Sequence, residues 1–396
     1  MIMPIKRSIY LDHAASTPTD PQVVEAMLPY FTETYGNASG VHSQARASAQ
    51  AIDDARQKVA NVLGCTAGEI VFTGCGTESD NLAIRGVAWA KKQAGEGNHI
   101  ITSPIEHHAV SHTIDQLCDK FGFEQTVVPV DHEGVVDIKA IEAAIRPETT
   151  LISVMYANNE VGSLQPIADI GALARSRGIT FHTDAVQAAG YESLRVDDLN
   201  VDLLAISGHK IYAPKGVGIL YVRRNTRLLP TLTGGGHEEN RRPGTENVPY
   251  IVGIAKALEL VAARRDEENR RQMALRDKLI NGVLNSIPNS QLTGHPTQRL
   301  PNNASFIFDG CEADPILMHL DLAGIQAASG SACTTGMPEP SHVLTAMGVP
   351  YDLGLSALRL SIGRQTTEAD IDTVLTVLPD VIQKVRQLNP AYSMRP

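Results

Sequence analysis

The chain has 396 residues, a formal net charge of −10 and a hydrophobic content of 43%. This size suits two domains, or one large domain with a smaller one attached. The acidic balance argues against proteins that bind nucleic acid or anionic membranes, because both partners favour a basic surface. No apolar stretch is long enough to cross a bilayer, and the segment from Met1 to Asp12 is too short and mixed for a signal peptide. We therefore expect a cytoplasmic protein with no nucleic-acid or membrane partner.

The cysteine content also favours the cytoplasm, where thiols remain reduced. The cysteines are few, odd in number and free of any C-x-x-C pair: Cys65, Cys75, Cys118, Cys311 and Cys333. This spacing predicts neither a disulfide framework nor a structural zinc site. It leaves open whether one of the five takes part in chemistry.

Short apolar segments alternate with amphipathic ones along the first 250 residues. Strands are predicted at 69–73, 99–103, 125–130, 151–155, 180–183, 203–207 and 216–222. Helical spacing occurs between them, at 81–94, 107–121, 137–145 and 167–176. This alternation predicts an α/β domain built on a mostly parallel sheet.

The pattern changes near Tyr250. A long helix is predicted over 250–287, followed by strands at 304–308 and 356–361 and helices at 314–323 and 367–388. We expect a large domain over 15–259. A smaller α+β domain would be formed by 1–14 and 260–396.

Three segments at predicted strand ends contain side chains that could bind a cofactor or take part in catalysis. Glycines flank Cys75 before a helix, where free N–H groups and Thr77 could hold a phosphate, although an ordinary helix cap explains them equally well. Lys210 directly follows an apolar strand, and lysine forms Schiff bases with carbonyl compounds, although a lone lysine is more often a solvated loop residue. Asp184 ends another strand, where it could pair with a ring-nitrogen cation or cap the next helix. Together these residues fit pyridoxal 5′-phosphate (PLP), which needs a lysine, an acid and a phosphate cradle.

Several longer motifs resemble one family, the cysteine desulfurases that include the NifS and IscS proteins. They are GTESDNLAI (76–84), ANNEVG (157–162), HTDAVQAAG (182–190), SGHKIYAPKGVG (207–218), GGGHEENRRPGTEN (234–247) and SGSACTTGMPEPSHVL (329–344). The resemblance runs from YLDHAASTP (10–18) to LRLSIGRQTT (358–367). It implies the PLP-dependent transferase fold type I, with a mostly parallel sheet flanked by helices in the large domain.

The resemblance also implies roles for individual residues. Lys210 matches the lysine that bonds to the cofactor, Asp184 the acid on its pyridine nitrogen, and His107 the imidazole stacked on its ring. The other matches to cofactor contacts are Gly76, Thr77, Asn159, Gln187, Ser207, His209 and, from the second subunit of a homodimer, Thr245. Arg359, with Asn159, matches the group that binds the substrate carboxylate, for which a planar guanidinium is well suited. No metal is expected, because the spacing of His108 and His112 is more often a polar helix face.

Cys333 is the cysteine that the resemblance makes catalytic. It lies in a stretch of small, uncharged residues without helical or strand periodicity, which indicates a mobile, exposed loop over about 328–341. A thiolate on such a loop could approach a substrate sulfur and then move away with it. The other four cysteines are interpreted as packing residues.

The function implied is removal of sulfur from L-cysteine, giving L-alanine and a persulfide on Cys333. The persulfide sulfur would pass to an acceptor, such as an iron–sulfur scaffold protein. Three alternatives remain open: a selenocysteine lyase, a PLP aminotransferase of the same fold, and a sulfur-relay subunit that only binds partners.

Overall fold

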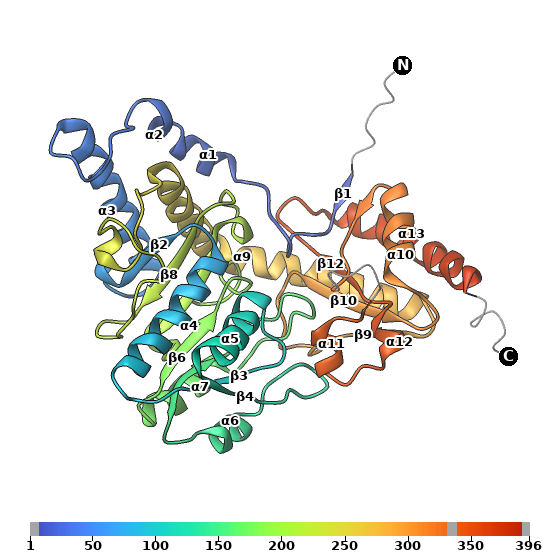
Figure 1. Ribbon diagram of the computed structural model, residues 1–396. Coiled ribbons are helices and arrows are strands. Elements are labelled where there is room, and N and C mark those ends of the chain that lie inside the picture. Colours follow the sequence, from blue (N-terminus) through green and yellow to red (C-terminus); the bar gives the residue numbers. More distant parts are fainter. Residues whose placement is uncertain (1–7, 331–338, 390–396) are drawn as a thin grey trace.

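The computed structural model describes residues 8–330 and 339–389. Figure 1 shows a larger part that contains the N-terminal helices and the central sheet, and a smaller part that contains the last helices. Helix α9 (Val248–Ser286) runs from the larger part into the smaller one.

The larger part is built on a seven-stranded sheet. Its strands lie in the order β2 (Ile70–Thr73), β8 (Gly218–Val222), β7 (Leu203–Ser207), β6 (Thr180–Asp184), β5 (Thr149–Ser153), β3 (His99–Thr102) and β4 (Glu124–Val127). Only β8 runs antiparallel to its neighbours β2 and β7; the other pairs are parallel. The carboxyl ends of the remaining six strands therefore meet at one edge of the sheet.

Successive side chains of these strands enter two different cores. Leu203 and Leu220 pack with α4 (Gly76–Gln93) and α5 (His108–Phe121) on one face. Leu204 and Ile219 pack on the other face, where the covering helices are α3 (Ser43–Leu63), α7 (Ile167–Ser176) and the first half of α9, with α1 (Pro21–Met27) packed outside them. Except in the edge strand β4, every residue of these strands is buried, and β2, β7 and β8 are almost continuously apolar.

The smaller part has its own core. An antiparallel sheet in the order β12 (Leu358–Ser361), β10 (Asn303–Phe308) and β9 (Ser290–Leu292) packs on α10 (Ala313–Leu322), α13 (Glu368–Leu388) and the second half of α9. Strand β1 (Ile9–Tyr10) pairs with β11 (Ile325–Gln326), so the N-terminal segment joins this part. The core residues along α9 change from the first core to the second between Val261 and Leu275. The remaining short helices are α2 (Pro29–Thr32), α6 (Ile138–Ala144), α8 (Val196–Leu199), α11 (His342–Ala346) and α12 (Tyr351–Gly354).

The structure confirms the predicted α/β class. It also contains helical segments that the sequence patterns did not predict. No element was predicted before residue 69, yet α3 is 21 residues long. Four of its eight buried residues are alanine and one is serine, so large apolar side chains occur on this face only at Ile52, Val59 and Leu63. Helix α4 begins five residues before the predicted start at residue 81, because its first turn faces a cavity and carries no apolar residue.

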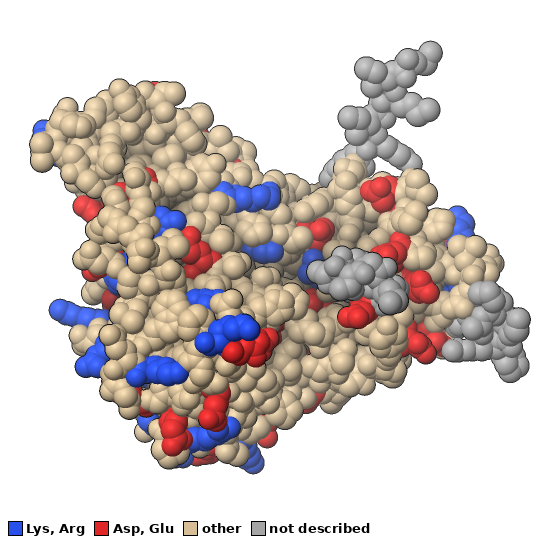
Figure 2. Space-filling model, in the orientation of Figure 1, with Lys and Arg blue, Asp and Glu red and all other residues tan. Residues whose placement is uncertain are grey.

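Charge is spread over the described surface. Figure 2 shows acidic and basic side chains interspersed on the face it displays, without a continuous basic area on the described residues. Among the described helices, none has the length and apolar content needed to cross a membrane.

Candidate active site

The predicted site residues meet at the carboxyl edge of the large sheet. A cavity of about 410 Å³ lies there, and ten of them line it. They come from loops after β2, β3, β5, β6 and β7, and one comes from β12 of the smaller part. Such an edge, where several strands end together, is the usual ligand site of α/β proteins.

Lys210 lies in a short 3₁₀ turn directly after β7. Its Nζ donates hydrogen bonds to the backbone oxygens of Ala14 (2.6 Å) and Ala15 (2.8 Å), and no carboxylate of the described residues forms an ion pair with it. Burial, helped by the charge of Arg359, lowers the pKa of Lys210 to about 8. A lysine in this state has a substantial neutral fraction near pH 8, which suits a nucleophile or a base.

Asp184 ends β6 on the floor of the cavity. Its Oδ1 accepts the N–H of Val186 at 2.8 Å. Burial raises its pKa, while that hydrogen bond and the charges of His107 and Lys210 oppose the rise. Gln187 lies one turn further on and donates from Nε2 to the oxygen of Ala14 at 2.9 Å, which ties it to the segment that receives Lys210.

His107 is the N-cap of α5. Its Nδ1 accepts the N–H of Ala109 at 3.1 Å, so the neutral ring carries its proton on Nε2. The cap thereby holds the imidazole in one orientation at the wall of the cavity.

The N-terminus of α4 also lines the cavity. The N-cap is Cys75, which provides no side-chain cap, so the first N–H groups of the helix remain available for an anion. A Cβ on Gly76 would lie 3.0 Å from side-chain atoms of Ser207 and Val186, which explains the glycine. Thr77, Ser207 and His209 line the same end, and burial lowers the pKa of His209 to about 4.

Arg359 enters the cavity from β12. Its side chain is only 8% exposed, with Nη2 2.9 Å from Asp12 Oδ1 and Nη1 donating to the backbone oxygen of Asn159 at 2.8 Å. Asn158, in contrast, is buried and bonds to the backbone of Ile105, Glu160 and Val161. Of the two asparagines, Asn159 therefore lines the cavity and Asn158 holds its loop.

These residues fit pyridoxal phosphate. A neutral-capable amine, a buried carboxyl and an uncapped helix start lie around one cavity, and each matches a different end of that cofactor. The predicted acid ends β6 and the lysine follows its neighbour β7, whereas the phosphate cradle follows β2, which is distant in sequence but separated from β7 in the sheet only by β8.

Among the described residues, one predicted residue does not line this cavity. Thr245 lines a separate cavity with Glu246 and Arg242, away from Lys210 of its own chain. Its loop is held by an ion pair between Arg242 and Glu78, at 2.7 Å, behind the helix start. Cys333 and most of the predicted loop over 328–341 lie outside the described residues.

The interpretation of Cys75 as a packing residue is wrong. Its side chain is exposed and lines the cavity, because the turn that was expected to enclose it is the open start of α4. Cys65, Cys118 and Cys311 are partly or fully buried, and burial raises the pKa of each thiol. Asp80, which the sequence motifs did not single out, also lines the cavity; it lies one turn after Gly76 on the same helix.

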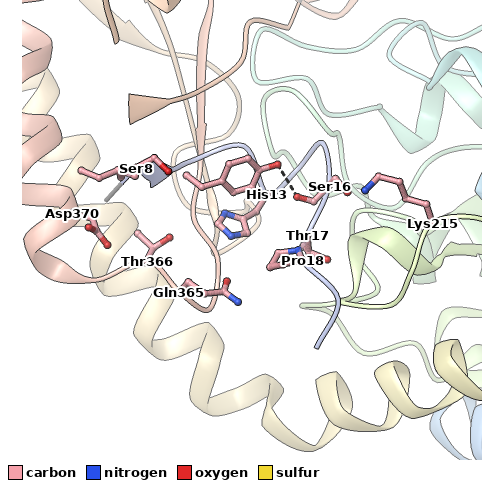
Figure 3. A pocket seen from close by; sticks show the side chains of 11 residues that line it. Ser8, His13, Ser16, Thr17, Pro18, Lys215, Gln365, Thr366 and Asp370 are labelled. Atoms are coloured by element: carbon pink, nitrogen blue, oxygen red, sulfur yellow. Dashed lines mark hydrogen bonds between the residues drawn. The ribbon is translucent and has the colours of Figure 1, made fainter. Parts of the chain in front are cut away.

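A second cavity, of about 450 Å³, shares the segment that follows β1. Ala14 and Ala15 line the first cavity, whereas His13, Ser16 and Thr17 line the second. Figure 3 shows Lys215 at this second cavity, on the side of Ser16 and opposite Gln365 and Asp370. None of the predicted site residues lines it.

Histidines gather beside the first cavity. The rings of His108 and His112 stack at 4.4 Å between centroids, and His342 lies 4.8 Å from His108. His342 Nε2 donates to the oxygen of Glu106 at 3.0 Å. Within the described part of the chain, no group of three potential ligands is arranged to hold a metal ion.

Comparison with known proteins shows the family of the chain. The class defined by the fold and the cavity is that of PLP-dependent enzymes, and the family model for aminotransferase class-V matches residues 9–374. The chain belongs to that family and, within it, groups with the cysteine desulfurases.

Several relatives are named cysteine desulfurase, and the structural neighbours include a NifS-like protein. A protein named cysteine desulfurase IscS from Methanosarcina thermophila is 50% identical over 97% of this chain and 94% of its own length. One of the same name from Dictyoglomus turgidum is 47% identical over 98% and 97%. Among solved structures, a NifS-like protein (TM-score 0.89, 35% identity) covers 95% of this chain and is itself covered completely. SspA in complex with cysteine (TM-score 0.79, 36% identity) covers 90% of this chain and 99% of its own.

The lowered pKa of Lys210 predicts how cofactor loading depends on pH. The neutral amine is the reactive form, so the rate at which the cofactor-free protein acquires pyridoxal phosphate should rise about tenfold per pH unit below pH 8 and level off above it. Stopped-flow absorbance between pH 6 and 10 measures this, with a free lysine derivative as the reference for the cofactor's own titrations. A rate that keeps rising in parallel with the free lysine would contradict the assignment.

Proposed function

We propose that this protein is an L-cysteine desulfurase that transfers the substrate sulfur to Cys333. The observation that carries the proposal is the convergence of Lys210, Asp184 and Arg359 on one cavity, with Arg359 supplied by the smaller part. An amino acid placed there would have its carboxylate at a guanidinium and its Cα beside an amine that is partly neutral near pH 8.

Each residue of the site has a separate role in this reaction. Arg359 binds the carboxylate, Lys210 removes the Cα proton, and His107 carries a proton at Nε2 near the substrate thiol. Bound pyridoxal phosphate supplies the electron sink for the charge left at Cα. The Cys333 thiolate attacks the substrate sulfur, so that an S–S bond forms and the C–S bond breaks. Protonation of the carbon fragment gives alanine, and Cys333 retains the sulfur as a persulfide.

Replacing Cys333 tests this assignment directly. With L-cysteine and a reductant, the unmodified protein should release alanine and sulfide in equal amounts, and Cys333→Ala should lose about 10²-fold or more of both. Mass spectrometry without reductant should find one extra sulfur on the peptide that contains Cys333. Cys65→Ala, at a thiol outside the cavity, is the matched control and should retain turnover. Equal alanine release by Cys333→Ala and the unmodified protein would refute the role of Cys333.

The same assay separates the rival activities. Faster turnover of L-selenocysteine that survives Cys333→Ala would indicate a selenocysteine lyase, and consumption of a keto acid would indicate an aminotransferase. We also propose that an acceptor protein in the cytoplasm, such as an iron–sulfur scaffold, takes the sulfur. Transfer of labelled sulfur from Cys333 to a candidate acceptor measures this, and release only as free sulfide would count against it.

A homodimer is part of the proposal. Thr245 lies away from the cavity of its own chain, which supports its expected contact with the cofactor of a second subunit. Large apolar side chains are exposed along the N-terminal helices: Val24, Leu28, Phe31, Tyr35 and Val41. Such a surface is typical of an interface. Sedimentation of the loaded protein as a monomer at micromolar concentration would contradict the dimer.

A further inference from the structure

Two buried polar side chains at the cavity each have one atom without an ordinary hydrogen-bond partner among the described residues. Asp80 on α4 is 1% exposed and His182 on β6 is fully buried. Asp80 Oδ1 and His182 Nε2 have no other partner among the described residues, and they lie 3.5 Å from each other. Unpaired buried polar atoms are energetically unfavourable, so such atoms are rare in folded proteins. The two side chains therefore form a pair, and one proton must lie between them.

The surroundings of Asp80 decide where that proton lies. The carboxyls of Asp184 and Glu106 are buried nearby, and Cys75 adds a further acidic group. Burial, followed by the charges of Asp184 and Glu106, raises the pKa of Asp80 well above its ordinary value. Burial also lowers the pKa of His182 to about 3, so the imidazole stays neutral and offers Asp80 no positive charge. Neighbouring carboxyls in one dry site do not all ionise.

Asp184 is the better place for a negative charge. Its Oδ1 accepts a backbone N–H from Val186, and the charges of Lys210 and His107 stabilise its ionised form. Among the described residues, Asp80 Oδ1 has no hydrogen-bond donor of this kind, and the neutral His182 lies 3.5 Å from it. The same cavity wall therefore contains one carboxyl suited to ionisation and one suited to keeping its proton.

We propose that Asp80 is a positioning residue that remains a carboxylic acid and donates its proton to His182 Nε2, which leaves Asp184 as the one ionised carboxylate for the cofactor's pyridine nitrogen. His182 then carries its own proton on Nδ1 and donates it to Ser153 Oγ, 2.9 Å away. The chain of donors runs from α4 through β6 to β5 and orients every group in it. The inference rests on the proposed function only for the identity of the cofactor, and it does not depend on cysteine as the substrate.

Infrared spectroscopy can observe the proton on Asp80. In H₂O/D₂O difference spectra at pH 8, we expect a protonated-carboxyl band in the loaded and the cofactor-free protein. The band should disappear in Asp80→Asn and persist in Glu106→Gln, which separates it from the band of the neighbouring buried Glu106. If Asp80→Asn leaves every carboxyl band in place, or if its band is lost above about pH 4 as for an ordinary aspartate, the proposal is wrong.

Nitrogen NMR of the unmodified protein tests the same point without a variant. With ¹⁵N-labelled histidine, the signals of His182 should show a proton on Nδ1 and an unprotonated, hydrogen-bonded Nε2. Asp80→Asn should preserve this pattern, because its amide N–H can replace the acid as donor. An Nε2–H form in the unmodified protein would mean that Asp80 is ionised and would overturn the inference, even if Asp80→Asn failed to fold. Neither measurement needs turnover, so a failure of the desulfurase assay would leave the result unaffected.

Discussion

Replacing Lys210 with alanine is expected to abolish turnover of L-cysteine, with kcat lowered by at least about 10³-fold. The substitution removes both the amine that bonds to the cofactor and the base that takes the Cα proton. The purified protein should also lose the visible absorbance that pyridoxal phosphate shows when it is joined to a lysine. Absorbance spectra and alanine release measure the two losses separately.

Two further variants test whether the effect of Lys210→Ala comes from the loss of the amine or from the loss of its positive charge. Lys210→Arg keeps a cation next to Ala14 and Ala15 but has no nucleophilic amine, so it should be as inactive as the alanine variant. Lys215→Ala removes a lysine five residues later that lines the second cavity, and it should keep both activity and absorbance (Figure 3). Retained absorbance in Lys210→Ala would show that another residue holds the cofactor.

The second large effect is expected at Arg359. Arg359→Ala should lower kcat/KM for L-cysteine by about 10²-fold, mainly through a higher KM, because truncating one partner of a buried charge pair typically costs 2–5 kcal/mol. The guanidinium is nearly buried and faces the same cavity as Lys210. Initial rates over a range of cysteine concentrations separate the effects on KM and kcat.

A matched arginine tests whether this effect is local. Arg364 also pairs with an aspartate, Asp20 at 3.0 Å, and stacks over the Tyr212 ring, but it does not line the cavity. Arg364→Ala should therefore leave the KM for cysteine unchanged. Asp12→Asn removes the carboxylate next to Arg359 and should leave KM equal or lower, because less charge competes with the substrate. If KM rose as much in Arg364→Ala as in Arg359→Ala, the effect would arise from a changed arrangement of the two parts of the fold and not from a lost contact with the substrate.

Much of the fold was predictable because its signals are local. The buried strands of the large sheet are short apolar runs, and the predicted ranges for β7 and α7 coincide with the observed ones. Helix α3 was not predicted, and only three of its buried residues, Ile52, Val59 and Leu63, are large and apolar. The antiparallel direction of β8 could not be predicted either, since strand direction depends on the path of the chain and not on the residues of one strand.

The sequence by itself determined which chemical groups the protein has: a lysine, an aspartate and a glycine-rich turn, each at a strand end, within motifs that identify the family. The comparisons confirm that family and its cofactor. Only the tertiary structure decided which of these groups share a cavity. Gly76 and Lys210 lie 134 positions apart in the chain, and they meet because β8, β7 and β2 are neighbours in the sheet.

The tertiary structure also decided what each environment does to its groups. Cys75 became exposed because its turn is the open start of α4, and Thr245 was placed away from the cavity of its own chain. Asp80 belongs to a recognised motif, yet its relation to His182 depends on the packing of α4 against β6. Burial and neighbouring charge arise from residues distant in sequence, so the protonation states on which the chemistry depends are properties of the folded molecule.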